Sequence, residues 1–207
     1  MPTFADTAGQ LSDLSRLFYS RGWVLGTSGN FSAVLTAEPL RLAITTSGVD
    51  KGLLESTDIV AIDDQARVVE GSGRPSAEAA LHLAIVRSRG AGAVLHTHSI
   101  WSTILSDDGS SLAVDGYEML KGLDGVRTHE HREELPIIEN TQDWPAAVPQ
   151  IDAVLRTKPG AHGFLIRRHG LYTWGRDLTE AKRHVEILEF LLEAMGRTRG
   201  GATAWQP

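Results

Sequence analysis

Cysteine is absent from this 207-residue sequence. The chain therefore has no disulfide framework, no thiolate ligand for a metal and no thiol nucleophile. Any metal ion must be bound through histidine, aspartate or glutamate side chains. The absence of cysteine also leaves the redox compartment of the protein undecided.

A surplus of positive charge is missing as well. The chain has 20 lysine and arginine residues against 26 aspartate and glutamate residues, a formal net charge of −6 at pH 7 with histidine neutral. This balance excludes the broad basic surface of a general nucleic-acid-binding protein, although a local basic pocket is compatible with it. No nucleic acid is therefore expected among the partners.

Long hydrophobic runs are also missing. The longest uncharged stretch of note, residues 91–106, is interrupted by Gly92, two histidines and several hydroxyl residues, so it cannot span a membrane. The first ten residues, MPTFADTAGQ, lack the basic segment and apolar run of a secretory signal. We therefore expect a cytoplasmic protein with no membrane partner.

Hydrophobic residues make up 42% of the chain, enough for the core of one domain over residues 1–207. Their spacing predicts helices at residues 6–21, 75–88, 100–105, 142–158 and 178–195, and strands at residues 31–35, 41–46, 59–62, 66–69, 93–95 and 164–166. Some strands alternate with helices and others pair as hairpins, which predicts an α/β fold with a mixed sheet flanked by helices. Residues 198–207, including Trp205, are predicted to form a loose tail.

The strongest chemical signal is a pair of histidines at the end of a strand. His96 and His98 directly follow the apolar run 93–95, and side chains two residues apart on a strand share one face. His169 follows a second apolar strand, 164–166, and is the best third ligand. Three imidazoles that leave a fourth position to water or substrate are typical of catalytic zinc, with manganese, iron and cobalt as alternatives. The competing interpretation is an ordinary polar strand end.

The other histidines give weaker signals. His129 and His131 lie in the polar stretch 127–134, which favours a solvated loop over a ligand pair. His82 is four residues after Glu78 on a predicted helix and is interpreted as its structural partner. Surface or core-edge positions are expected for His162 and His184.

Two loops rich in glycine and hydroxyl residues form the other constellation. They are residues 26–30 (GTSGN) and residues 45–48 (TTSG). Backbone N–H groups in such turns, helped by Ser, Thr and Asn side chains, can bind a phosphate; the alternative is a pair of plain turns. Glu78, in the first turn of its predicted helix, is explained by the helix dipole alone, and Glu118 by a solvated helix face.

Taken together, these motifs identify a family resemblance. GTSGN, TTSGVDKG, RPSAE with the later His82, VLHTH and RRHGLYTWG, in this order, resemble the class II (zinc-dependent) aldolase family over nearly the whole chain. The segments 118–122, 136–141 and 167–175 resemble its methylthioribulose-1-phosphate dehydratase branch, which belongs to methionine salvage. The resemblance implies a central, mainly antiparallel sheet between helical layers.

The resemblance also implies roles for particular residues. His96, His98 and His169 match the ligands of one zinc ion per subunit. The phosphate of the substrate is expected to be bound by Asn30, Ser47, Gly48 and Ser76, with Lys51 as a further candidate. Glu78 matches the catalytic glutamate of the aldolases, while Tyr117 and Glu118 match acids that approach the zinc site of a neighbouring subunit in a homotetramer.

The implied substrate is a phosphorylated ketose. The dehydratase branch converts 5-methylthioribulose 1-phosphate to 5-methylthio-2,3-dioxopentyl phosphate, and we favour Glu118 for both proton transfers, with Glu78 orienting the substrate or a water. One alternative is a class II sugar-phosphate aldolase or epimerase of the L-fuculose or L-ribulose phosphate type. A more distant alternative is a non-catalytic interaction module like the adducin head.

Overall fold

The computed structural model describes residues 3–201. The nine strands within these residues are β1 (Asn30–Ala37), β2 (Leu40–Thr45), β3 (Ile59–Asp63), β4 (Val68–Glu70), β5 (Ala93–Thr97), β6 (Ser111–Val114), β7 (Glu133–Ile138), β8 (Gly163–Ile166) and β9 (Gly170–Gly175). The helices are α1 (Phe4–Ser20), α2 (Ala79–Arg89), α3 (Ile100–Leu105), α4 (Trp144–Thr157) and α5 (Leu178–Gly201), with short 3₁₀ helices η1 (Ser56–Asp58) and η2 (Glu118–Gly122).

All of these strands belong to one sheet in the order β4-β3-β2-β1-β5-β9-β8-β7-β6. Every neighbouring pair is antiparallel except β7 and β8, which are parallel. The expected mixed, mainly antiparallel sheet is confirmed. Its middle strands β1, β5 and β9 bring residues from distant parts of the sequence side by side.

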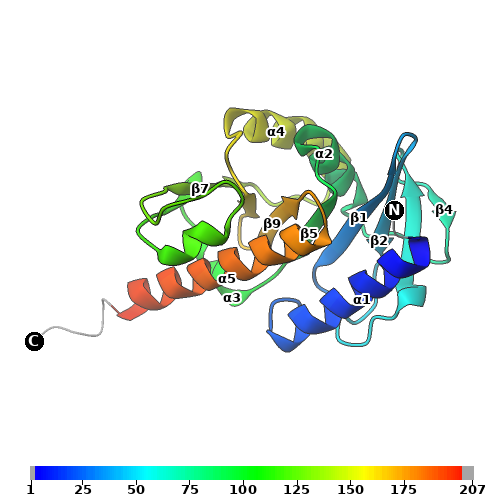
Figure 1. The fold of residues 1–207 in the computed structure, drawn as a ribbon, viewed down its shortest axis with the longest axis horizontal. Coiled ribbons are helices and arrows are strands. Elements are labelled where there is room, and N and C mark those ends of the chain that lie inside the picture. The colour runs from blue at the N-terminus through cyan, green and yellow to red at the C-terminus, as the bar shows by residue number, and fades with distance from the viewer. Residues whose placement is uncertain (1–2, 202–207) are drawn as a thin grey trace, which may run out of the picture.

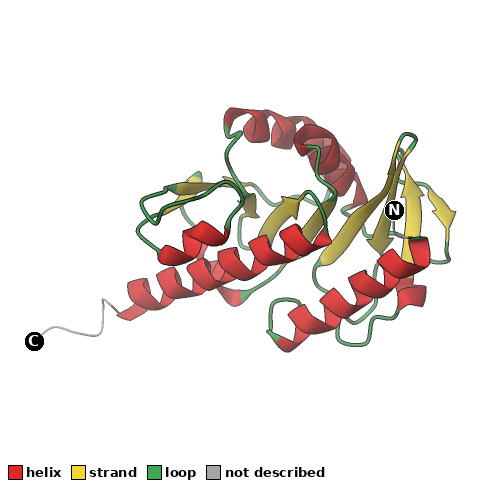
Figure 2. Ribbon diagram, viewed as in Figure 1, coloured by secondary structure: helices red, strands yellow, loops and turns green. Residues whose placement is uncertain are grey.

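Helices cover both faces of the sheet (Figure 1, Figure 2). Helices α2 and α4 pack on one face over a cluster that includes Leu81, Ile151 and Phe164. The opposite face is covered by α1 and α5, which bury Leu11 and Val185 against it. The sheet is therefore the middle of three layers, and functional side chains have to emerge at its strand ends.

The helix expected at residues 75–88 begins later than predicted, at Ala79. Pro75 forms a bridge to Thr46, and the backbone N–H of Ser76 donates to the Thr45 carbonyl at 3.2 Å. The N–H of Ser47 donates in turn to the Arg74 carbonyl at 2.9 Å, so the segment before the helix pairs with the end of β2 in an extended conformation. Glu78 consequently stands at the N-cap and not within the first turn.

Helix α5 is longer than the sequence indicated. The apolar pattern predicts an end at Met195, whereas the helix continues to Gly201. Gly196 lies within this extension, where a Cβ atom would come within 2.0 Å of the Trp101 ring. A glycine at this position therefore allows the helix to pack closely against an aromatic ring. The predicted tail 198–207 is helical up to residue 201, and its remainder, with Trp205, lies outside the described residues.

Strands β6, β7 and β9 were not anticipated by the sequence patterns. Strand β7 begins with two glutamates and contains Pro136, features that are unfavourable in a strand interior. Pairing with β6 and β8 nevertheless buries Glu133, Leu135 and Ile138. Tertiary context overrides local preference here.

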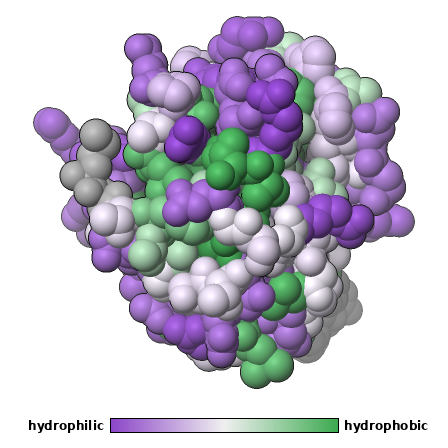
Figure 3. Space-filling view, turned by 90° about the vertical axis from the view of Figure 1, so that its right-hand side faces the viewer, coloured by the Kyte–Doolittle hydropathy of each residue, from purple (hydrophilic) through white to green (hydrophobic). Residues whose placement is uncertain are grey.

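The surface on the side of α1 and β4 is of mixed polarity. Figure 3 shows apolar atoms gathered near the middle of this face and hydrophilic atoms around them. Among the described residues, no helix combines the length and the apolar character needed to cross a membrane.

Candidate active site

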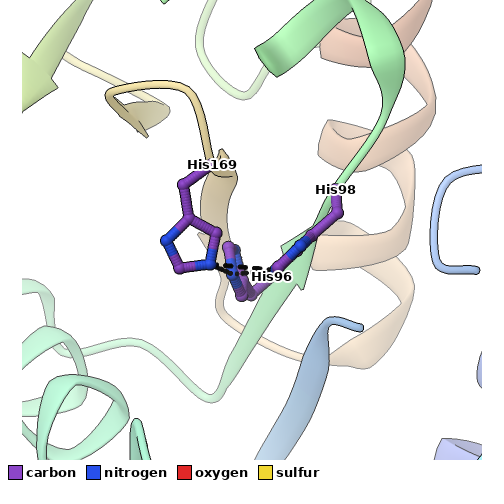
Figure 4. Close-up of side chains that lie close together, drawn as sticks. All are labelled: His96, His98 and His169. Atoms are coloured by element: carbon purple, nitrogen blue, oxygen red, sulfur yellow. Dashed lines mark hydrogen bonds between the residues drawn. The ribbon is translucent and has the colours of Figure 1, made fainter. Parts of the chain in front are cut away.

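Three histidines meet where strands β5 and β8 end, at their carboxyl ends. His96 is the fourth residue of β5 and His98 follows that strand directly, while His169 lies in the turn between β8 and β9. Their Nε2 atoms are 2.8 Å apart for His96 and His98, 3.1 Å for His98 and His169, and 3.4 Å for His96 and His169. Figure 4 shows the rings converging from the two elements. The predicted triad is therefore assembled by the fold.

Hydrogen bonds at the ring nitrogens that face away from the triad fix the tautomers of His96 and His169. The Nδ1–H of His96 donates to the Leu171 carbonyl at 2.9 Å, and that of His169 donates to Asn140 Oδ1 at 3.2 Å. In a neutral imidazole the opposite nitrogen then carries a lone pair. Such hydrogen bonds are the usual support of metal-binding histidines.

Burial keeps the three imidazoles neutral. Desolvation, followed by the neighbouring His169, holds the pKa of His96 well below its usual value. Desolvation and the other two rings lower the pKa of His98 to about 2, and desolvation lowers that of His169. Tetrahedral zinc at its usual 2.0–2.1 Å from nitrogen separates its ligands by about 3.3 Å, close to the observed distances. The triad fits a divalent metal ion.

Glu78 lies directly beside the triad. Its Oε2 is 3.4 Å from His96 Nε2, and its Oε1 is 3.6 Å from His169 Nε2. Oε2 accepts hydrogen bonds from Asn30 Nδ2 at 2.9 Å and from the Tyr172 hydroxyl. The carboxylate is thus held in a defined orientation beside the metal ligands.

The strand register explains this arrangement. His96 on β5 pairs with Asn30 on β1 and with Tyr172 on β9, so the three side chains stand in one row across the sheet. The Tyr172 ring stacks on the His96 ring with 4.0 Å between centroids. Burial, and then the Glu78 charge, raise the pKa of Tyr172 well above its ordinary value, which keeps it a hydrogen-bond donor.

His82 supports the row from helix α2. Its Nε2 lies against Asn30 Oδ1, and its Nδ1 is 2.7 Å from the Ser32 hydroxyl. Burial lowers the pKa of His82 to about 4, so the ring is neutral and bridges the two residues. The ring has a structural role, but its partners are Asn30 and Ser32 and not Glu78, which it reaches only through Asn30.

A cavity of about 160 Å³ lies next to the triad. The residues expected to bind phosphate line it together, namely Asn30, Ser47, Gly48, Ser76 and Lys51, along with Glu78 and His98. The N–H of Ser47 is hydrogen-bonded to the Arg74 carbonyl, and Gly48 adopts a φ of +83°, a conformation that favours glycine. Residues of the two glycine-rich loops thus line one small polar cavity.

Lys51 links these two loops through hydrogen bonds. Its side chain is buried, and its Nζ donates to the carbonyls of Thr27 and Val49, both at 3.1 Å. Desolvation lowers the pKa of Lys51. The ammonium group therefore positions the loops and brings positive charge close to the cavity.

Tyr117 and Glu118 lie elsewhere on the chain. Glu118 begins the short helix η2, its side chain is 72% exposed, and its carboxylate pairs with Lys121 Nζ at 2.7 Å. The side-chain hydrogen bond from Lys121 lowers the pKa of Glu118. Neither residue is among those that line the cavity beside the histidines. Within a single chain, the candidate acid is separate from the metal site.

Sequence reasoning missed two supporting residues. Tyr172 carries no signal beyond its place three residues after His169, because strand β9 was not anticipated. Glu189, buried on α5, accepts a hydrogen bond from Thr97, the residue between His96 and His98. Its position in the predicted helix gave no indication of this contact, which depends on how α5 crosses β5.

Comparison with known proteins places the chain in a family. Residues 9–195 match the model of the class II aldolase and adducin N-terminal domain. The chain belongs to this family. The methylthioribulose-1-phosphate dehydratase of Marinobacter nauticus is 41% identical over 194 residues, 92% of each chain, and that of Methylococcus capsulatus is 43% identical over 199 residues, 95% of this chain and 96% of the relative.

Solved structures agree on the fold. The L-fuculose-1-phosphate aldolase of Thermus thermophilus superposes with a TM-score of 0.76 at 24% identity, covering 98% of both chains. Another L-fuculose 1-phosphate aldolase has a TM-score of 0.78 at 24% identity, covering 94% of this chain and 87% of the other. The resemblance to the class II aldolase family is confirmed.

Proposed function

We propose that this protein is a metal-dependent lyase that removes water from 5-methylthioribulose 1-phosphate and yields 5-methylthio-2,3-dioxopentyl phosphate. The observation that carries the proposal is the convergence of three neutral histidines beside Glu78 and a small polar cavity. The named relatives, at 41–43% identity over nearly their whole length, support the choice of reaction within the family.

The cavity between the glycine-rich loops binds the phosphate. Ser47 and Ser76 offer hydroxyl groups, Gly48 offers a backbone N–H group, and Asn30 lies at the boundary with the metal site. Lys51, which is hydrogen-bonded to both loops, contributes positive charge beside the cavity. A phosphate bound there leaves the sugar chain running toward Glu78 and the histidines. Because this local cavity binds the phosphate, an acidic protein needs no broad basic surface.

His96, His98 and His169 hold zinc, the metal that this donor set favours. When bound, zinc supplies Lewis acidity to the oxygen atoms of the substrate ketone and its neighbouring hydroxyl. Glu78 stays oriented by Asn30 and Tyr172 and positions the substrate by accepting a hydrogen bond from one of its hydroxyl groups.

Glu118 carries the proton transfers, reaching the site from a neighbouring subunit of a homotetramer. Its exposed position and its lowered pKa provide an ionised carboxylate on the surface of the chain. That carboxylate removes the proton from C3 and returns it to the hydroxyl that leaves C4 as water. The resulting enol then converts to the diketone, so atoms and protons balance. Tyr117, next to it, contacts the same substrate.

The experiment is mass spectrometry of the products formed from 5-methylthioribulose 1-phosphate by purified, zinc-loaded protein. We expect a product lighter by one water, and we expect Glu118→Gln to abolish turnover while its zinc content stays unchanged. Glu130→Gln, which alters an exposed carboxylate of the following loop, is the matched control and should keep full activity.

Two outcomes would contradict the proposal. Release of a three-carbon phosphate would indicate cleavage of the C3–C4 bond and favour the aldolase alternative. Full activity of Glu118→Gln would remove the assignment of the acid, and the same measurement on Glu78→Gln would then test the other carboxylate.

A further inference from the structure

A second group of metal-ligating side chains lies at the amino end of strand β8, and the three histidines lie at its carboxyl end. His131 precedes β7, Glu133 is the first residue of β7, and His162 precedes β8. Because β7 and β8 are parallel neighbours, their amino ends meet at the same edge. His169 follows the carboxyl end of β8, so the four residues of that strand, about 13 Å, separate the two groups.

The carboxylate of Glu133 is the centre of this group. Its Oε2 is 3.0 Å from His131 Nε2 and 2.9 Å from His162 Nδ1. Its Oε1 accepts the backbone N–H of His162 at 2.8 Å. The three potential ligand atoms all lie within 4.8 Å of one another, and Glu133 is 1% exposed. Two imidazoles and one carboxylate thus converge on one point from two strands.

The orientation of His162 is fixed from behind. Its Nε2–H donates to the Asp124 carbonyl at 2.8 Å. This hydrogen bond directs Nδ1 toward Glu133, in the same way that the Leu171 carbonyl directs Nε2 of His96 at the first site. A backbone carbonyl that accepts from the outer nitrogen is the usual support of a ligating imidazole.

The group opens onto a cavity of about 470 Å³ whose lining includes His131, His162 and Asp124. The His131 side chain is 32% exposed, whereas the Glu133 side chain is almost fully buried. The cavity provides an entry path and room for water molecules as further ligands. One side of the group is therefore anchored in the sheet and the other is accessible to solvent.

We propose that His131 Nε2, Glu133 Oε2 and His162 Nδ1 form a second binding site for a divalent transition-metal ion. Nitrogen and carboxylate ligands of this kind suit zinc, cobalt, nickel or ferrous iron and are a poor match for calcium or magnesium, which prefer oxygen atoms alone. Water from the cavity completes the coordination. The site is independent of the triad because it shares no residue with it.

The proposed site would fasten a long connection to the sheet. The segment between β6 and β7 runs through η2 and is closed by a hydrogen bond from the Gly116 N–H to the His129 carbonyl, 3.1 Å long. His131 stands at the end of this segment. A metal ion bound to His131, Glu133 and His162 would join it to β7 and β8 at once.

Zinc stoichiometry tests the proposal. Protein freed of metal with a chelator is dialysed at pH 7.5 against buffered zinc, and bound zinc is counted by mass spectrometry. We expect two zinc ions per wild-type chain and one in His131→Gln, Glu133→Gln or His98→Gln. The double variant His98→Gln/His131→Gln should bind none. His129→Gln, on the same loop with a side chain 58% exposed, is the matched control and should bind two.

Two results would overturn the proposal: one zinc ion in the wild-type chain with no change in His131→Gln, or two ions that persist in His131→Gln and Glu133→Gln. Circular dichroism establishes that each variant is folded, and the partly exposed His131 provides a variant with little disturbance of the core. Anomalous scattering from zinc-soaked crystals then locates the second ion, and density away from these three ligand atoms would also overturn the assignment.

Discussion

The two ends of strand β8 carry histidine clusters of opposite character. At its carboxyl end, His169 meets His96 and His98, and desolvation lowers the pKa of all three. At its amino end, His162 contacts Glu133. Burial alone would lower the pKa of His162, but the Glu133 carboxylate, followed by the carbonyl and charge of Asp124, outweighs burial and raises it. One end presents imidazoles whose pKa values are lowered, and the other a histidine whose pKa is raised beside a carboxylate.

The difference shows that neighbours, and not burial alone, decide what a histidine can do. A carboxylate is present at both ends. Oε2 of Glu78 is occupied by the Asn30 amide and the Tyr172 hydroxyl, whereas Oε2 of Glu133 accepts from the ring nitrogens of His131 and His162. The first arrangement leaves the Nε2 lone pairs available for a metal at neutral pH. In the second, a metal has to displace a proton.

The largest effect is expected from a ligand of the triad. His98→Gln removes one of three nitrogen ligands, so we expect loss of the tightly bound zinc and a fall in dehydration rate of about a thousandfold or more, since Lewis-acid stabilisation contributes several kcal/mol. Zinc analysis and product mass spectrometry on the same preparation provide the measurement. Retention of both zinc and activity would show that the two ends of β8 do not differ as described.

A stability effect is expected at the other end. Glu133→Gln leaves the partly buried His162 without its carboxylate partner, and breaking such a pair costs about 3 kcal/mol, or roughly a hundredfold in the unfolding equilibrium. Urea unfolding at pH 5.5 in the presence of chelator measures it. His129→Gln, in the exposed part of the same loop, should unfold like the wild type. An equal loss in both variants would point to a general effect on the loop.

The support of Glu78 should matter for rate more than for stability. Tyr172→Phe keeps the ring that stacks on His96 and removes only the hydroxyl that donates to Glu78. We expect a roughly 10- to 100-fold fall in kcat, as for other residues that orient an active-site ligand, about 1 kcal/mol of lost stability and unchanged zinc content. Equal kcat values in the variant and the wild type would show that Asn30 alone orients the carboxylate.

Much of the fold was predictable because its apolar patterns are strong. The inner face of α5, with Ala181, Val185 and Leu188, is fully buried as expected, and α3 has the predicted bounds. The segment from β6 to β7 was not predictable, because Glu133 is buried by cross-strand and histidine contacts that no local pattern reveals. The start of α2 was misplaced for a related reason, since Pro75 pairs with Thr46 instead of opening the helix.

The candidate site, like the fold, was only partly predictable from the sequence. His96 and His98 were visible because strand periodicity places them on one face, and His169 because it ends a second apolar strand. Tyr172 and the role of His82 depend on the register of three strands, which is a long-range property. His131 was predicted to be a loop residue and His162 to lie at a surface or core edge; their meeting with Glu133 follows only from the parallel pairing of β7 and β8.

The smallest effect concerns pH, and the two ends of β8 should respond with opposite sign. Desolvation alone would raise the pKa of Glu133, but hydrogen bonds and charge from His162 outweigh it and lower the pKa in the folded chain. The contribution of Glu133 to stability is therefore present above its ordinary value of about 4.3 and is lost as pH falls through the folded value. The raised pKa of His162 gives a contribution that is complete below about 6.5 and is lost as pH rises through its folded value.

Both contributions are present between about pH 4.3 and 6.5. In the presence of chelator, the free energy of unfolding of the wild type should therefore exceed that of Glu133→Gln by the largest amount near pH 5.5 and by less at pH 8.5. At the triad the sign reverses. The pKa of His98 is lowered to about 2, so its neutral form favours the folded state above about pH 6.5, and that contribution is lost on acidification. Urea titrations of the wild type, Glu133→Gln and His98→Gln at both pH values measure the two slopes. A difference between wild type and Glu133→Gln that stays constant from pH 5.5 to 8.5 would mean that His162 is neutral, and the two ends of β8 would then be alike.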